Sequence, residues 1–161
     1  CGPRRWLRPS PVAQCESIAF EQTDATRGIK MTADKLEILE LLNRYILSID
    51  SHDDAQFADN FHDDAVYVSP FGTATGREQI LATIHQWHQG GITAGKRHMI
   101  GAWRIDLDGD RATSQSSCWV VNAKDGTTIV ASGDYTDELT KKNGVWKLQR
   151  RVQTIDPSFK M

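Results

Sequence analysis

Residues 96–155 read KRHMIGAWRIDLDGDRATSQSSCWVVNAKDGTTIVASGDYTDELTKKNGVWKLQRRVQTI, and this stretch decides the fold. Along it the spacing of apolar residues falls to a period of two, which is typical of half-buried strands. Three tight turns divide it, each built on Asp-Gly or Asn-Gly, because these residues tolerate the positive φ that short hairpins require. The sequence therefore predicts a four-stranded antiparallel meander, with strands at Lys96–Leu107, Arg111–Ala123, Thr127–Lys141 and Val145–Ile155.

Upstream of the meander the apolar spacing is helical, as in the series Leu36, Leu39 and Ile46. A turn at Asp63-Asp64, a short strand at Ala65–Val68 and a loop or hairpin at Pro70–Gly76 interrupt this pattern. Long strands must twist and curl, so we expect an α+β fold in which helices pack on the concave face of a curved sheet and leave a cone closed at one end. The three predicted helices are Ala33–Ile49, Asp54–Phe61 and Arg77–Gln89.

Composition excludes several classes of function. The 161 residues carry a net charge of −2, so no basic face for nucleic acid or an anionic membrane is expected. No apolar run approaches the roughly 20 residues needed to cross a bilayer. Of the three cysteines only Cys118 falls in the patterned region, and disulfide-built folds need an even, dense set. We therefore expect a protein of the reducing cytoplasm, with no membrane or nucleic-acid partner.

The first thirty residues differ in character from the rest. They contain three prolines and show neither a sustained period nor the apolar segment of a secretory signal. Their acids, Glu16, Glu21 and Asp24, argue against an organelle transit peptide. The pattern changes at Met31, so we interpret residues 1–30 as a disordered leader or a non-native extension and residues 31–161 as the domain.

Two polar residues stand out at the ends of predicted elements. Asp50 closes the first helix, where a carboxylate meets the negative end of the helix dipole. His98 opens the first long strand, and either residue alone is more often structural than catalytic. The curled strands can bring the two together across the mouth of the cone, where a carboxylate would fix the imidazole tautomer and leave the second nitrogen as a base. Tyr45 is either an additional phenolic donor or a half-buried core residue.

Spaced single residues throughout the patterned region resemble the SnoaL-like superfamily, which has the nuclear transport factor two-like fold. The resemblance covers about Met31 to Asp156 and implies a cone-shaped curved antiparallel sheet with three helices, a cystatin-like α+β roll. The matching residues are Tyr45-x4-Asp50, Phe61-His62-Asp63-Asp64-Ala65, Arg97-His98, Gly133-x-Tyr135-x-Asp137-Glu138-Leu139, Gly144-x-Trp146 and Arg150-Arg151-Val152.

Within the superfamily the sequence is most similar to the dehydratase and dehydrochlorinase branch, which includes scytalone dehydratase, bile-acid 7-alpha dehydratase and hexachlorocyclohexane dehydrochlorinase. The resemblance implies that Asp50 and His98 form a catalytic dyad and that Tyr45 is an accessory donor. Scytalone dehydratase has a second pocket histidine on a later strand, and the strand Arg111–Ala123 has none. Gln153 or Thr154 stands near the place of an arginine in the bile-acid enzyme. These departures leave the substrate open.

Several other residues are candidates for the site. We expect four aromatic residues to bind substrate: Trp87, Trp119, Tyr135 and Phe71. The pair His85-x-x-His88 has metal-compatible spacing, but no acid or cysteine nearby in the sequence completes a ligand set. No phosphate loop, nucleophile elbow or dinucleotide motif is present, so we expect neither a metal nor a cofactor.

The favoured function is therefore a cofactor-independent lyase of the dehydratase or dehydrohalogenase type. It would act on a small, largely apolar cyclic or steroid-like molecule, because cone pockets are mostly hydrophobic. An isomerase or polyketide-cyclase-type enzyme with the same dyad is an alternative, and a non-catalytic ligand-binding or assembly domain is another. We also expect a homo-oligomer, a dimer or trimer, formed through apolar residues on the outer sheet face such as Val120 and Ile129.

Overall fold

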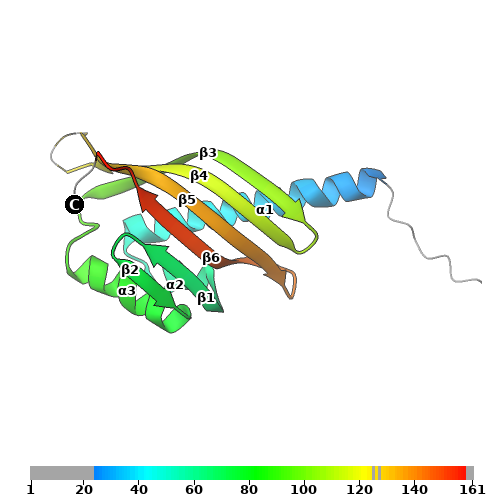
Figure 1. Cartoon of the computed structure of the whole chain (residues 1–161), viewed down its shortest axis with the longest axis horizontal. Helices are drawn as coiled ribbons and strands as arrows, with labels where there is room; N and C mark the ends of the chain where they lie inside the picture. The colour runs from blue at the N-terminus through cyan, green and yellow to red at the C-terminus, as the bar shows by residue number, and fades with distance from the viewer. Residues whose placement is uncertain (1–23, 125, 127, 159–161) are drawn as a thin grey trace, which may run out of the picture.

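The computed structural model describes residues 24–124, 126 and 128–158, and it confirms the α+β class (Figure 1). One six-stranded sheet has the order β2-β1-β6-β5-β4-β3, in which only the β1–β6 pair is parallel. Figure 1 shows α1 running across one face of the long strands, with α2 and α3 beside β1 and β2. The elements are α1 Asp24–Ser51, α2 Asp54–Asp59, β1 Phe61–Ser69, β2 Gly72–Thr75, α3 Arg77–Gln89, β3 Lys96–Asp108, β4 Arg111–Asn122, β5 Thr128–Lys142 and β6 Val145–Ile155.

Helix α1 differs from its prediction in length and in the face that it buries. It begins at Asp24 instead of Ala33, so the last residues of the expected leader are helical, whereas residues 1–23 lie outside the described part. Residues 25–33 are exposed, which is why no apolar pattern marked them. Leu36 is 57% exposed, because the face against the sheet is rotated away from it. The buried apolar residues of the helix are Ile38, Leu41, Leu42, Tyr45, Ile46 and Ile49.

Strand β1 is longer than predicted and takes in residues expected elsewhere. Phe61 was expected in the second helix and Asp63-Asp64 in a turn, yet all of them belong to the strand. The pairing with β6 jumps from Phe61↔Leu148 to Val66↔Arg150, so the two exposed acids occupy an irregularity in the ladder. Polar residues that resemble a turn therefore mark a bulge here.

Strand β3, at one edge of the sheet, also contains a bulge. Its pairing with β4 shifts between Gly101↔Ser117 and Arg104↔Gln115, and Ala102 has a φ of 53°. The extra residue changes which positions face inward. As a result Ile100 and Trp103, three residues apart, both pack against the core.

A buried ion pair lies beneath the aromatic core. The guanidinium of Arg151 donates through Nε and Nη2 to the two carboxylate oxygens of Asp137, both at 2.7 Å, and Ser114 donates to the same carboxylate at 2.7 Å. The guanidinium also lies 4.0 Å from the ring centre of Tyr45 and 4.4 Å from that of Tyr135. Burial alone would lower the pKa of Arg151, but Asp137 outweighs burial and raises the pKa, so the arginine remains charged.

None of the described helices combines the length and the apolarity that a membrane-spanning helix requires.

Candidate active site

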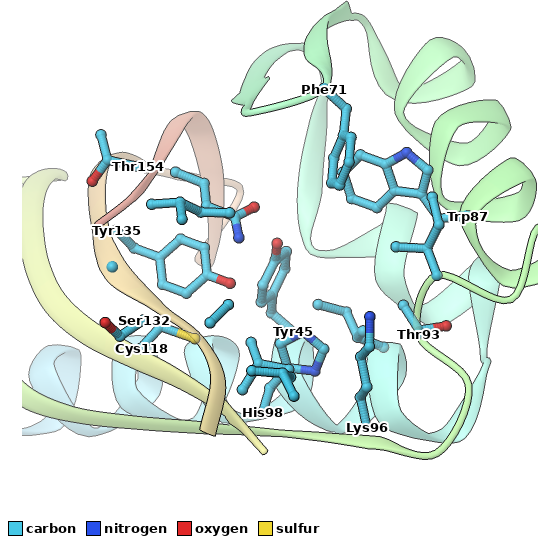
Figure 2. Close-up of a pocket in the computed structure, with 18 of the residues that line it drawn as sticks. Tyr45, Phe71, Trp87, Thr93, Lys96, His98, Cys118, Ser132, Tyr135 and Thr154 are labelled. Atoms are coloured by element: carbon cyan, nitrogen blue, oxygen red, sulfur yellow. The ribbon is translucent and has the colours of Figure 1, made fainter. Parts of the chain in front are cut away.

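A cavity of about 120 Å³ opens between the inner face of the sheet and the carboxyl-terminal end of α1 (Figure 2). Its walls come from segments far apart in the sequence, between Tyr45 and Ile155, which the curl of the sheet brings together. Most of the lining is aromatic or aliphatic, which favours an apolar occupant. The lining residues are Tyr45, Ile49, Tyr67, Phe71, Trp87, Ile92, Thr93, Lys96, His98, Cys118, Val120, Val130, Ala131, Ser132, Gly133, Tyr135, Gln153, Thr154 and Ile155.

Asp50 and His98 are in contact at this cavity. The Nδ1 of His98 lies 2.8 Å from Oδ1 of Asp50, and the backbone N–H of His98 donates to both carboxylate oxygens at 3.2 Å. The side chain of His98 is 11% exposed and that of Asp50 is 7% exposed. Three hydrogen bonds to one neighbour hold a carboxylate in a position where the helix dipole disfavours it.

This contact fixes the state of the imidazole. A carboxylate accepts hydrogen bonds, so Nδ1 must carry the proton that joins it to Asp50, and the neutral ring then has an unprotonated Nε2. His98 lines the cavity and Asp50 does not. Among the described residues, none forms a hydrogen bond with Nε2 of His98. The arrangement therefore presents a basic nitrogen to the cavity with a carboxylate behind it.

Tyr45 lines the cavity and belongs to the core at the same time. Its hydroxyl donates to the hydroxyl of Tyr67 at 3.1 Å, which in turn donates to Oε1 of Gln153 at 2.8 Å. Burial raises the pKa of Tyr45, and Arg151 offsets this only in part; burial also raises the pKa of Tyr67. Both phenols therefore keep their protons. The Tyr45 proton is directed to Tyr67, so Tyr45 is a link in a hydroxyl chain, and its role as an accessory donor stays a prediction.

The four predicted substrate-binding aromatics divide into two groups. Phe71, Trp87 and Tyr135 line the cavity, with Phe71 and Trp87 packed at a ring-centre distance of 5.1 Å. Trp119 does not line it: side chains alternate along a strand, and its neighbours on either side face the cavity. Trp119 is 40% exposed on the opposite face of the sheet.

The same alternation corrects one residue of the expected subunit interface. Val120 faces the cavity and packs on the core, so it is not available to an outer surface. Ile129, paired with Val121, is 55% exposed. The oligomeric state itself remains a prediction.

Three lining residues of chemical interest were not predicted from the sequence. Lys96 lies two positions before His98 on the same strand, so the period of two could have identified it as sharing that face. Burial raises the pKa of the Cys118 thiol to about 11, which makes it a weak nucleophile. Gly133 approaches the neighbouring strand so closely that a Cβ there would lie 1.9 Å from the carbonyl oxygen of Thr154.

A second group of histidines anchors the elements around the cavity mouth. His85 and His88 both contact the carboxylate of Asp54 through Nδ1, and Nε2 of His88 lies 3.1 Å from the carbonyl oxygen of Ile49. The ring of His52 stacks on that of His88 at 4.1 Å. These contacts tie α3 to the end of α1, immediately beside Asp50. Within the described residues, no group of three or more potential ligands is arranged to hold a metal ion.

Comparisons with known proteins agree with this architecture. A family model described as the SnoaL-like domain matches residues 30–152. A protein of unknown function with a cystatin-like fold from Nostoc punctiforme is 32% identical with a TM-score of 0.72, over 79% of this chain and 94% of that one. No curated protein matches the chain closely enough to add to these findings.

Two further solved structures have the same fold. A variant of Rv3472 from Mycobacterium tuberculosis, described as of unknown function, is 26% identical with a TM-score of 0.75, over 83% of this chain and 78% of that one. An NTF2-like protein with a cystatin-like fold from Novosphingobium aromaticivorans is 24% identical with a TM-score of 0.77, over 86% and 92% of the two chains.

Proposed function

The chain belongs to the SnoaL-like domain family, and we propose that it is a cofactor-independent lyase in which His98 removes a proton from carbon. The observation that carries this proposal is the 2.8 Å contact between Asp50 and Nδ1 of His98, with the ring itself lining the cavity. An oriented imidazole with a free nitrogen inside an apolar cavity is a general base, and a base of this kind typically accelerates proton transfer by about 10²–10⁴-fold.

The proposed reaction is an elimination. Nε2 of His98 takes the proton from a substrate carbon, the C–H electron pair becomes a C=C bond, and a hydroxyl or halide leaves from the neighbouring carbon with its bonding pair. Asp50 stabilises the imidazolium that forms. When the leaving group is hydroxide, the imidazolium returns its proton and water departs. Asp50 does not line the cavity, so we assign it a positioning role.

The lining supports the proposed class of substrate. Phe71, Trp87 and Tyr135 contribute aromatic rings to the wall, and six aliphatic residues contribute further apolar surface: Ile49, Ile92, Val120, Val130, Ala131 and Ile155. Such a cavity favours a small, largely apolar ring compound with few polar groups.

An isomerase or cyclase is the second candidate, and the hydroxyl chain through Tyr45, Tyr67 and Gln153 favours it. This chain lies on the cavity wall and could return a proton to a substrate atom other than the one that lost it. The two candidates share the proton-abstraction step and differ in whether a group leaves.

The test is proton abstraction in the intact chain, measured against a panel of small cyclic alcohols, halides and ketones. Nuclear magnetic resonance in D2O reports exchange at carbon, and mass spectrometry reports loss of water or halide. We expect His98→Gln and Asp50→Asn each to lower turnover by at least about 10²-fold. His85→Gln is the matched control, because His85 is an exposed histidine of α3 that does not line the cavity.

The positioning role of Asp50 has its own readout. Without the carboxylate the imidazolium is less stable, so Asp50→Asn should move the acidic limb of the pH–rate profile to lower pH and reduce kcat more than it changes KM. Normal turnover in either variant would show that the dyad is structural. Exchange at carbon without loss of a group would favour the isomerase, and binding with no exchange from any compound would favour a ligand-binding domain.

A further inference from the structure

We propose that Lys96 binds the oxyanion that develops on the substrate when His98 removes the proton. The substrate is then a carbonyl compound, with the departing group on the carbon β to its C=O. This inference rests on the proposed function and identifies the chemical class of the molecule that the cavity accepts.

The position of Lys96 is the first observation. It lies two residues before His98 on β3, and alternate residues of a strand share a face. Both residues line the cavity. Figure 2 shows the Lys96 side chain extending from its strand, with its nitrogen at the free end between the labels of Tyr45 and Thr93.

The charge of the cavity is the second observation. No aspartate or glutamate is among the described residues that line it, and Lys96 is the single lysine or arginine among them. The carboxylate of Asp50, behind His98, is engaged by three hydrogen bonds from His98. By contrast Lys141 and Lys147 form ion pairs at 2.8 Å with acids of their own. An ammonium beside an apolar wall without a counter-charge attracts an anion more strongly than it would in water.

The protons of two phenols in the cavity lining are already committed. The Tyr45 proton is directed to Tyr67, and the Tyr67 proton to Gln153. A cation is the stronger partner for a developing negative charge, and Lys96 supplies the one that the lining contains.

The chemistry balances without a co-reactant. Nε2 of His98 takes the proton α to the carbonyl, the C–H pair forms a C=C bond, and the carbonyl π pair moves to oxygen as an enolate bound by Lys96. The enolate then reforms the C=O, the C=C shifts to the α,β position, and the β-hydroxyl leaves with its bonding pair. The proton held by His98 joins the departing hydroxide, so the products are an α,β-unsaturated carbonyl compound and water.

Binding of an enolate mimic to the intact chain tests this assignment directly. 4-Nitrophenolate carries a planar, delocalised oxyanion, and nitrobenzene has nearly the same shape without charge. We expect the wild-type protein to bind 4-nitrophenolate about tenfold more tightly than nitrobenzene, as one charge-assisted hydrogen bond would give. In Lys96→Met, which keeps the length of the side chain, this preference should vanish while nitrobenzene binds as before.

Lys124→Met is the matched control, because Lys124 packs against Gly95 near the same end of the sheet but does not line the cavity. It should retain the preference for the phenolate. 4-Nitrobenzoate separates an enolate site from a site for a permanent carboxylate, and tighter binding of the benzoate than of the phenolate would overturn the assigned substrate class. Equal binding of phenolate and nitrobenzene by the wild type, or no binding of either, would overturn the inference.

The tests of the Lys96 oxyanion site and of the proposed lyase function can fail independently. If turnover depends on His98 but Lys96→Met retains full activity and phenolate binding, the lyase stands and the oxyanion site does not. If the phenolate preference depends on Lys96 but no compound exchanges a proton, the cavity is an anion-binding site without the proposed catalysis.

Discussion

Replacing Arg151 with methionine should lower the free energy of unfolding by about 3–5 kcal/mol, the usual effect of removing one partner from a buried ion pair. Both charged side chains are completely buried. In the variant the carboxylate of Asp137 would keep a single donor, the hydroxyl of Ser114 at 2.7 Å. Contacts of the guanidinium with two tyrosine rings would also be lost, worth up to about 2 kcal/mol when desolvated, but the methionine thioether replaces part of this.

Urea denaturation followed by circular dichroism measures this change, and Arg150→Met is the matched control. Arg150 is the half-buried neighbour on the same strand, outside the buried pair, and its replacement should change the free energy of unfolding by less than about 1 kcal/mol. The double variant Arg151→Met/Asp137→Leu should be more stable than Arg151→Met alone by at least about 2 kcal/mol, because no unpaired charge remains buried. A loss below about 1 kcal/mol for Arg151→Met, or additive losses in the double variant, would refute the reasoning.

Three further outcomes are expected. Gly133→Ala should destabilise the protein by about 2–3 kcal/mol, because the added methyl would lie 1.9 Å from a carbonyl oxygen of the facing strand; an unchanged urea midpoint would contradict this close approach. Partial burial pushes the pKa of Asp54 upward, but hydrogen bonds from His85 and His88 outweigh it and hold the pKa below the ordinary 3.8. The stability that Asp54 contributes is therefore complete above pH 3.8 and is lost as the pH falls through the lower pKa of the folded state. The free energies of unfolding of the wild type and of Asp54→Asn, measured in urea titrations, should therefore converge at acidic pH. A chain that begins at Met31 should melt within a few degrees of the full chain, because residues 25–30 are exposed; a large drop in Tm would show that the preceding segment packs on the domain.

Elements with strong local signals were predicted accurately. Helix α3, followed by Gly90-Gly91, and strand β6, which follows Asn143-Gly144, have the bounds that the sequence indicated. Turn and cap residues act locally, so a single stretch of sequence is enough to place them. The start of α1 was missed because its first residues are exposed, and a helical segment without a buried face leaves no apolar period to detect.

Register was harder to predict, and the buried ion pair illustrates why. The tight turn pairs Lys142 with Val145, and an unbroken ladder would then place Asp137 opposite Arg150. The observed ladder shifts between Glu138 and Leu139, which brings Asp137 opposite Arg151 instead. Such bulges respond to the curvature and packing of the whole sheet, which no short stretch of sequence records.

The candidate site likewise contains residues that local signals predict and residues whose position depends on strand register. Asp50 and His98 could be paired in advance because each lies at the end of a strongly patterned element. The side of the sheet on which Trp119 lies depends on the pairing of His98 with Val120, and that register is known only once the strands are assembled. Lys96 shares a face with His98, but nothing in its own neighbourhood signals a cavity.

The bulge at Gly101 and Ala102 has a consequence for aggregation. Within the described residues the sheet ends at two edge strands, β2 and β3, and an open edge is a template on which another chain can add a strand. Strand β2 is only four residues long, and β3 is interrupted by the bulge near its middle, so neither offers a long regular row of backbone donors and acceptors. Fibril-like growth from these edges is therefore disfavoured by the backbone itself.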